Sequence, residues 1–320
     1  MARHSSPGKV LYAALLGNVL IATTKFAAAA WTGSSAMLSE AVHSLVDTIN
    51  ELLLLYGIHR SRKPPDRSHP LGHGRELYFW SFIVALMVFG LGAGVSLFEG
   101  INHLLHPVPI ENPTVNYLVL GLSFVFEFGS WWVAFRAFRA AKGRRGYLEA
   151  IGAAKDPTIF TVLFEDSAAL LGLLIAFAGI WAAQIFDMPE LDGLASLGIA
   201  LVLATAGAAL ARRTKQLLIG EEARPELRRS ILEIASRHPG IASANGVLTS
   251  QLGADQVVAA LSAEFEDRLT TPQIEDCVRS LEEEIRSAHP EVSLLFVKPQ
   301  TAATWESRRR AIDAGGTDSD

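Results

Sequence analysis

Six long runs of apolar residues constrain the fold of this sequence more than any other feature. Each run is about 20 residues or longer, the length of an α-helix that crosses the hydrocarbon core of a bilayer. The runs lie at residues 10–30, 37–58, 77–104, 114–135, 157–183 and 191–211. Of the 320 residues, 50% are hydrophobic and only 19% are charged, which is too apolar for an ordinary soluble domain. We therefore predict a mostly α-helical membrane protein whose residues 1–219 form a six-helix transmembrane domain.

The loops between the apolar runs alternate in charge. The loops after the first, third and fifth runs contain no Lys or Arg, whereas those after the second, fourth and sixth are rich in both. Because basic loops stay in the cytoplasm, both termini are predicted to be cytoplasmic. The first run lacks a signal-peptide cleavage pattern and is predicted to remain as a helix. The Ala-, Arg- and Gly-rich composition, without a transit peptide, favours a bacterial inner membrane.

The residues after the last apolar run have the composition of a small α+β domain. Helical and alternating periods predict a helix, two strands, a helix and a strand at 225–238, 243–252, 255–265, 271–289 and 292–299. Residues 220–299 are therefore predicted to form a cytoplasmic domain, and residues 300–320 a disordered tail. The single cysteine, Cys277, excludes an intrachain disulfide.

Ionisable residues inside the predicted spans are the main functional signal, because each costs about 2.5–3.5 kcal/mol at the centre of a membrane helix. His43 and Asp47 are four residues apart, so a helix places both on one face, where imidazole and carboxylate can bind a cation such as Zn²⁺. Glu165 and Asp166 lie in the fifth run at a comparable depth. The alternative for His43 and Asp47 is a hydrogen-bonded packing pair between helices.

The remaining intramembrane charges have less direct interpretations. Adjacent helical residues point about 100° apart, so one of Glu165 and Asp166 faces the bundle, and we favour Asp166 as the ligand. Glu127 is a candidate fifth participant in the metal site. Lys25 is interpreted as structural, and Lys25 and Glu127 could each simply neutralise another buried group.

Several function classes are excluded or disfavoured. A net charge of −5 leaves no broad basic surface for nucleic acid. The sequence contains no His-Glu-x-x-His pair, Gly-x-Ser-x-Gly turn or phosphate-binding loop, so we do not expect an enzyme and expect no cofactor besides a transported metal. A metal channel or a metal-sensing membrane protein would use similar ligands without proton coupling and stays an alternative.

Three segments, in this order along nearly the whole chain, resemble the cation diffusion facilitator family. They read TGSSAMLSEAVHSLVDTINELLLLYG, PPDRSHPLGHGRELYFWS and LDGLASLGIALVLATAGAALARRTKQLLIGE. The resemblance implies six transmembrane helices followed by a metallochaperone-like, ferredoxin-like α+β domain. It also implies a homodimer that exports a divalent metal, most often Zn²⁺, in exchange for protons. The metal would bind a tetrahedral site with two ligands from the second helix and two from the fifth.

The resemblance assigns His43, Asp47 and Asp166 to that site, and places the fourth ligand on Val162. Valine has no lone pair, so Glu165, Glu127, Thr161 or water must complete the shell. An oxygen-rich shell would admit Mn²⁺, Fe²⁺ or Co²⁺ more readily, although His43 still favours a borderline metal over Mg²⁺. The segment DPTIFTVLFEDSAALLG resembles the branch of the family that contains the animal mitochondrial zinc exporter.

The resemblance also extends to two sites outside the spans. Asp66, His69 and His73 match a loop metal site of some family members, and their spacing of three and four suits one cation. The alternative is a loop that merely packs on the bundle. The C-terminal positions that bind metal in other members read Ser250, Ser262, Phe296 and Lys298, so we expect no metal there and a role in dimerisation.

The expected mechanism follows from competition between metal and protons. Metal binding requires a neutral His43 and ionised Asp47 and Asp166, so a bound cation displaces protons. In a bundle with two conformations, this competition produces antiport.

Overall fold

The computed structural model describes residues 7–110, 112–143 and 145–315 and divides into two compact units. The first unit comprises Met1–Lys63 and Glu76–Lys215, and the second comprises Pro64–Arg75 and Gln216–Asp320. The boundary between Lys215 and Gln216 lies close to residue 219, where the transmembrane domain was predicted to end. The loop at residues 64–75 differs from the prediction, because it belongs to the unit that contains the C-terminal residues.

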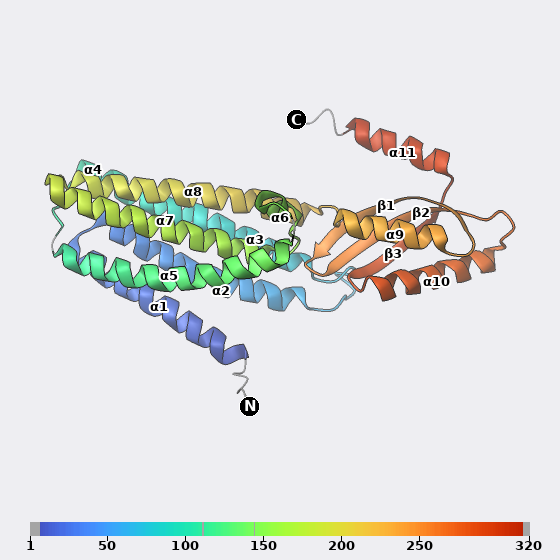
Figure 1. Ribbon diagram of the computed structural model, residues 1–320, viewed down its shortest axis with the longest axis horizontal. Helices are drawn as coiled ribbons and strands as arrows, with labels where there is room; N and C mark the ends of the chain where they lie inside the picture. Colours follow the sequence, from blue (N-terminus) through green and yellow to red (C-terminus); the bar gives the residue numbers. More distant parts are fainter. Residues whose placement is uncertain (1–6, 111, 144, 316–320) are drawn as a thin grey trace. The chain divides into compact units, whose positions relative to one another are not determined.

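Long helices form the first unit (Figure 1). The helices are α1 (Pro7–Thr32), α2 (Ser35–Ser61), α3 (Arg75–Met87), η1 (Val88–Ala93), α4 (Gly94–Leu105), α5 (Pro113–Lys142), α6 (Tyr147–Ala153), α7 (Pro157–Phe186) and α8 (Glu190–Ile219). The segment η1 is a π-helix that joins α3 to α4 without interruption. The short helix α6 was not predicted from the sequence.

Four helical segments within the described residues are long and apolar enough to cross a membrane. They are Arg75–Leu105, Pro113–Ala140, Phe160–Phe186 and Glu190–Ile219, and they coincide with the third to sixth predicted spans. The first two predicted spans correspond to α1 and α2, which are 26 and 27 residues long. Glu40, Asp47 and Glu51 lower the hydropathy of α2. The count of six spans therefore stays a prediction.

Local sequence signals begin α2 and α7. The Ser34 hydroxyl accepts the amide proton of Met37 at 3.1 Å, and the carboxylate of Asp156 accepts that of Thr158 at 2.9 Å. Both bonds satisfy amides that have no partner within the first helical turn. Asp192 of α8 also accepts the amide proton of Ser35 at 2.5 Å, so the N-terminus of α2 is tied to a second helix.

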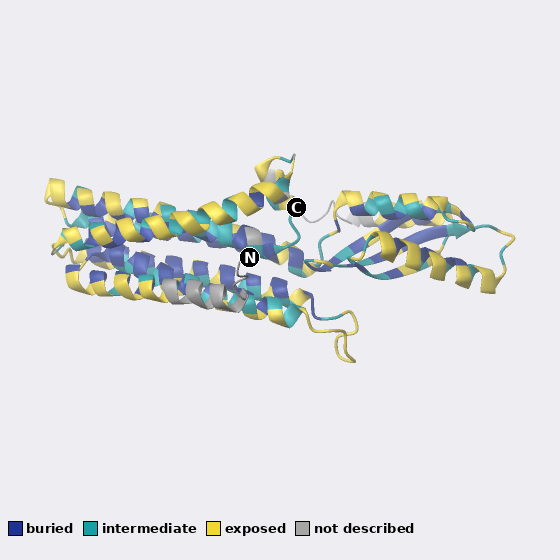
Figure 2. Ribbon diagram, turned by 60° about the horizontal axis from the view of Figure 1, so that its bottom comes forward, coloured by how far each residue is buried: buried dark blue, intermediate teal, exposed yellow. Residues whose placement is uncertain are grey.

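Apolar side chains lie both inside the first unit and on its outward faces. Met37, Ile199 and Leu203 belong to the buried core, whereas Phe98 and Leu201 are exposed. Figure 2 shows the exposed residues along the outward sides of the helices. Outward apolar side chains suit a hydrocarbon solvent, in which close helix packing replaces the hydrophobic effect as the main attraction between helices.

The second unit contains a three-stranded sheet in the order β1-β2-β3. Its elements are α9 (Pro225–Arg237), β1 (Ile241–Gly253), β2 (Gln256–Phe265), α10 (Thr271–Ala288), β3 (Val292–Pro299) and α11 (Ala302–Gly315). Strands β1 and β2 pair antiparallel, whereas β2 and β3 pair parallel across the connection through α10. The predicted order of helix, strand, strand, helix and strand is confirmed. Leu261, Leu281 and Ile285 lie in the core between sheet and helices.

The prediction of a disordered tail is wrong for most of its length. Residues Ala302–Gly315 form α11, which contacts β1 and β2. Trp305 is buried, and a methyl group on Gly246 of β1 would overlap its indole ring. One aromatic side chain in a polar segment gives no helical periodicity, so the sequence did not indicate this packing. Residues 316–320 of the predicted tail lie outside the described residues.

Candidate metal site

A cavity of about 300 Å³ in the first unit is lined by several of the ionisable residues that lie inside the predicted spans. Helix α2 supplies Ser44, Asp47, Glu51 and Leu54, whose spacing of three and four places them on one helical face. The other lining residues come from α1, α5 and α7. They are Asn18, Phe126, Glu127, Ser130, Val162, Glu165 and Asp166. Five of the lining side chains are carboxylates, and none of those described is basic.

The adjacent acids of α7 are held by different neighbouring helices. The Asn50 Nδ2 amide of α2 donates to Glu165 Oε1 at 2.7 Å. The Ser130 hydroxyl of α5 donates to Asp166 Oδ2 at 2.9 Å. The two side chains diverge, as adjacent helical positions require. Both nevertheless line the cavity, whereas the sequence predicted that only one of them faces the bundle interior.

His43 and Asp47 contain polar atoms that lack hydrogen-bond partners. His43 Nδ1 lies 3.5 Å from Asp47 Oδ1, and the His43 side chain is only 1% exposed. Neither His43 nitrogen nor Asp47 Oδ1 makes a hydrogen bond within the described part of the chain. A buried polar atom without a hydrogen-bond partner costs free energy, and binding a metal ion would compensate this cost.

The four predicted transport ligands do not share one coordination shell in this conformation. Within the described residues, only the loop group Asp66, His69 and His73 brings three such ligand atoms within 4.8 Å of one another. His43 and Asp47 are adjacent, whereas Glu165 and Asp166 are directed toward Asn50 and Ser130. The assignment of the four residues as transport ligands therefore stays a prediction.

A second group of buried charges lies beside the cavity. Lys25 of α1 is completely buried, and its Nζ lies 3.2 Å from Glu40 Oε2 and 2.7 Å from Ser44 Oγ. The sequence left open whether Lys25 neutralises another buried group, and the structure identifies Glu40 as that group. Ser44 connects the pair to the cavity, because its side chain also lines the cavity wall.

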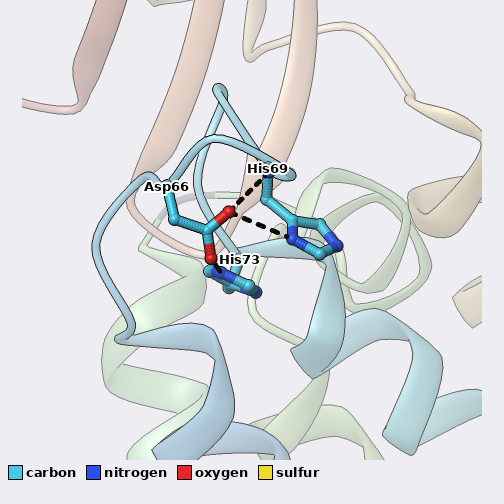
Figure 3. A group of neighbouring side chains, drawn as sticks. All are labelled: Asp66, His69 and His73. Atoms are coloured by element: carbon cyan, nitrogen blue, oxygen red, sulfur yellow. Dashed lines mark hydrogen bonds and ion pairs between the residues drawn. The ribbon is translucent and has the colours of Figure 1, made fainter.

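The loop group is compact, as Figure 3 shows. Asp66 Oδ2 lies 3.1 Å from His73 Nε2, and Asp66 Oδ1 lies 3.4 Å from His69 Nδ1. The two imidazole centroids are 4.3 Å apart. Gly72 has a φ of +84°, which a residue without Cβ adopts without strain, and it turns the backbone between the two histidines.

Asp66 is suited to bind a cation at neutral pH. Hydrogen bonds from the Ser68 hydroxyl, the His69 amide and the His73 ring lower the pKa of the Asp66 carboxyl below its usual range. The carboxylate is therefore ionised at neutral pH. The loop also contacts the second unit's sheet, since a methyl group on Gly74 would lie 2.6 Å from the Leu252 carbonyl oxygen. This contact explains why the loop belongs to that unit.

Comparison with known proteins decides the family. Residues 11–219 match the model of the cation efflux transmembrane domain. The chain belongs to the cation diffusion facilitator family. It is therefore a multi-pass integral membrane protein of a family of cation transporters, and two of the relatives described below are named as an antiporter and an efflux pump.

Three relatives illustrate the breadth of the family. The human proton-coupled zinc antiporter SLC30A9, mitochondrial, is 36% identical over 268 residues, which cover 83% of this chain and 47% of that protein. Metal tolerance protein C4 of Arabidopsis thaliana is 34% identical over 68% of this chain and 48% of the relative. The cation-efflux pump FieF of Cronobacter sakazakii is 27% identical over 88% of this chain and 90% of the relative. The chain spans about half the length of the first two relatives.

This cation diffusion facilitator has residues without the family's metal ligands at two places, as the sequence indicated. Val162 lines the cavity, where its side chain offers no ligand atom. In the C-terminal domain, Ser262 is buried and hydrogen-bonded to Asn245, and Phe296 is exposed. The expectation that this domain binds no metal remains a prediction.

Several residues around the cavity were not predicted from the sequence. Glu51, Ser44 and Asn50 lie three or four positions from Asp47 on α2, so helical spacing could have indicated them. Asn18 of α1 donates to Glu51 Oε2 at 3.0 Å, and Ser130 contacts Asp166. These last contacts join different helices, and no local spacing in the sequence predicts them.

Proposed function

We propose that this protein moves a divalent metal cation, Zn²⁺ in the first place, out of the cytoplasm in exchange for protons. The observation that carries this proposal is the cavity with five carboxylates beside the unpaired His43 imidazole. So many acidic groups at membrane depth need a cation or protons to offset their charge. A transporter uses this requirement, because the metal and the protons satisfy it in alternation.

The proposed ligands are His43, Asp47, Asp166 and Glu165, with Glu127 as a further participant. Glu165 would take the place of the ligand missing at Val162, since both side chains line the cavity. Binding would require α2 and α7 to bring their ligand atoms closer than in the present conformation, which fits alternating access. The mixed imidazole and carboxylate set suits Zn²⁺, and Mn²⁺, Fe²⁺ or Co²⁺ are the alternative cargoes.

We also propose a topology, a domain structure and an oligomeric state for the transporter. Six spans with cytoplasmic termini, a ferredoxin-like C-terminal domain and a homodimer are the expected form. The human relative is named as mitochondrial, whereas the composition of this chain favours a bacterial inner membrane. The proton-coupled zinc antiport in that relative's name supports proton coupling here.

Uptake into proteoliposomes tests the function. With an acidic lumen, the protein is expected to take up one of Zn²⁺, Mn²⁺, Fe²⁺ and Co²⁺, and Asp166→Asn is expected to reduce this uptake to the level of protein-free vesicles. Asp187→Asn is a matched control, because Asp187 is exposed at the end of the same helix. Gradient-independent ohmic flux would indicate a channel, and absence of flux for every metal would indicate a sensor.

Binding stoichiometry tests the loop group. We propose that Asp66, His69 and His73 bind one further divalent cation, so Asp66→Ala is expected to lower the zinc bound per chain by one equivalent. Equilibrium dialysis of the purified full-length protein measures this number. His73→Gln is a second variant with the same expected loss, and Asp267→Ala removes an exposed carboxylate elsewhere in the same unit as a control. Unchanged stoichiometry in both loop variants would show that the loop only packs.

A further inference from the structure

We infer that Asn50 is a positioning residue that orients Glu165 for metal binding, an inference that rests on the proposed function. Asn50 lies on α2 and is completely buried, and its Nδ2 donates to Glu165 Oε1 of α7 at 2.7 Å. Asn50 does not line the cavity, whereas Glu165 does. The amide therefore acts on the cavity only through the carboxylate that it holds.

The position of Asn50 on α2 explains how it can serve this site. It follows Asp47 by three residues, so both side chains lie near the same face of the helix. Asp47 lines the cavity, while Asn50 reaches across to α7. The hydrogen bond thus connects the two helices that carry the proposed ligands, at the level of the ligands.

The chemistry of the bond favours a ligand role for Glu165. An amide N–H that donates to a carboxylate stabilises its ionised form, which is the form that binds metal. The bond engages Oε1, and Asn50 makes no hydrogen bond to Oε2. Glu165 has one more rotatable bond than an aspartate, so a fixed partner reduces the number of orientations that its carboxylate samples.

The absence of a ligand at Val162 makes this orientation important. Val162 lines the same cavity but has no donor atom, so a carboxylate three residues further along α7 has to reach the metal. Partners that orient metal ligands are typically worth about 10-fold to 100-fold in metal affinity. We place Asn50 among such partners.

The competing interpretation is a hydrogen bond that only stabilises helix packing. The chain offers a matched control for it. Asn116 of α5 is also completely buried, and its Oδ1 accepts a bond from the Thr32 hydroxyl of α1 at 2.9 Å. Asn116 does not line the cavity. A packing role would make Asn50 and Asn116 equivalent in metal-binding measurements.

Zinc titration calorimetry of the purified full-length protein tests the inference. Asn50→Leu retains the approximate side-chain shape without the donor and is expected to weaken the Kd for Zn²⁺ about 10-fold. In proteoliposomes its KM for Zn²⁺ is expected to rise by a similar factor, with little change in kcat. Asn116→Leu is expected to retain the wild-type Kd. In a Glu165→Ala background, Asn50→Leu is expected to cause no further weakening.

The outcomes separate this inference from the proposed function. A wild-type Kd in Asn50→Leu, together with a weakened Kd in Glu165→Ala, overturns the role of Asn50 alone. A wild-type Kd in Glu165→Ala overturns the ligand role of Glu165. Equal weakening by Asn50→Leu with and without Glu165 shows that Asn50 does not act through this carboxylate. If Asn50→Leu does not fold, Asn50→Ala is measured in the same cycle.

Discussion

Replacement of Asp47 by alanine is expected to abolish gradient-driven metal uptake. Asp47 lines the cavity on α2, and its Oδ1 lies 3.5 Å from His43 Nδ1 without a hydrogen-bond partner of its own. The substitution removes an anionic oxygen ligand, and the alanine methyl group offers no atom that could replace it. Uptake of Zn²⁺ into proteoliposomes with an acidic lumen is expected to fall to the level of protein-free vesicles.

Two further variants make the Asp47 result interpretable. Asp47→Asn keeps the side-chain shape without the charge and is expected to fail as Asp47→Ala does. Thr48→Val is the control, because the Thr48 hydroxyl bonds to the Ser44 carbonyl within the same helix and does not line the cavity. Uptake that survives in Asp47→Ala would show that the cation binds elsewhere.

Replacement of Gly179 by alanine is expected to destabilise the helical unit by about 1–3 kcal/mol, the typical cost of overpacking. A methyl group on Gly179 of α7 would overlap the methyl group of Ala195 on α8. Both methyl groups are attached directly to the backbone, so no side-chain rotation relieves the overlap. The helices would have to separate, and close approach is the main source of attraction between helices in lipid.

Unfolding in detergent measures the effect of Gly179→Ala. Gly121→Ala is the matched control, because Gly121 lies in the interior of α5 and a methyl group there would meet nothing within 4 Å. That control is expected to leave stability unchanged or slightly raised, since alanine favours helix more than glycine does. Equal stability of Gly179→Ala and the wild type would show that α7 and α8 do not approach so closely.

Much of the fold could be predicted because the relevant signals are local. Long apolar runs predicted the long helices, since a backbone in hydrocarbon must satisfy its own hydrogen bonds. The spacing of His43 and Asp47 correctly predicted a pair on one face of α2. In the C-terminal unit, helical periodicity predicted a helix from residue 271, where α10 begins, and alternation predicted the strands.

The candidate site could be predicted only in part, because its contacts join different helices. The sequence favoured Asp166 over Glu165 as the ligand that faces the bundle, whereas both line the cavity and each has a separate partner on another helix. Ser130 became visible only through its contact with Asp166, whereas Asn50 lies at a helical spacing from Asp47 but takes its partner from α7. In the same way, the helix α11 was missed because its packing depends on Trp305 meeting Gly246, about 60 residues earlier in the chain.

The sequence by itself determined the apolar helices, the family and the loop group of Asp66, His69 and His73. These features depend on composition or on residues within eight positions of one another, where backbone geometry sets the distances. Only the tertiary structure decided which carboxylates share the cavity and which partners hold them. The physical reason is that a polar side chain in a membrane helix takes its partner from whichever helix packs against it, and helical periodicity does not specify that neighbour.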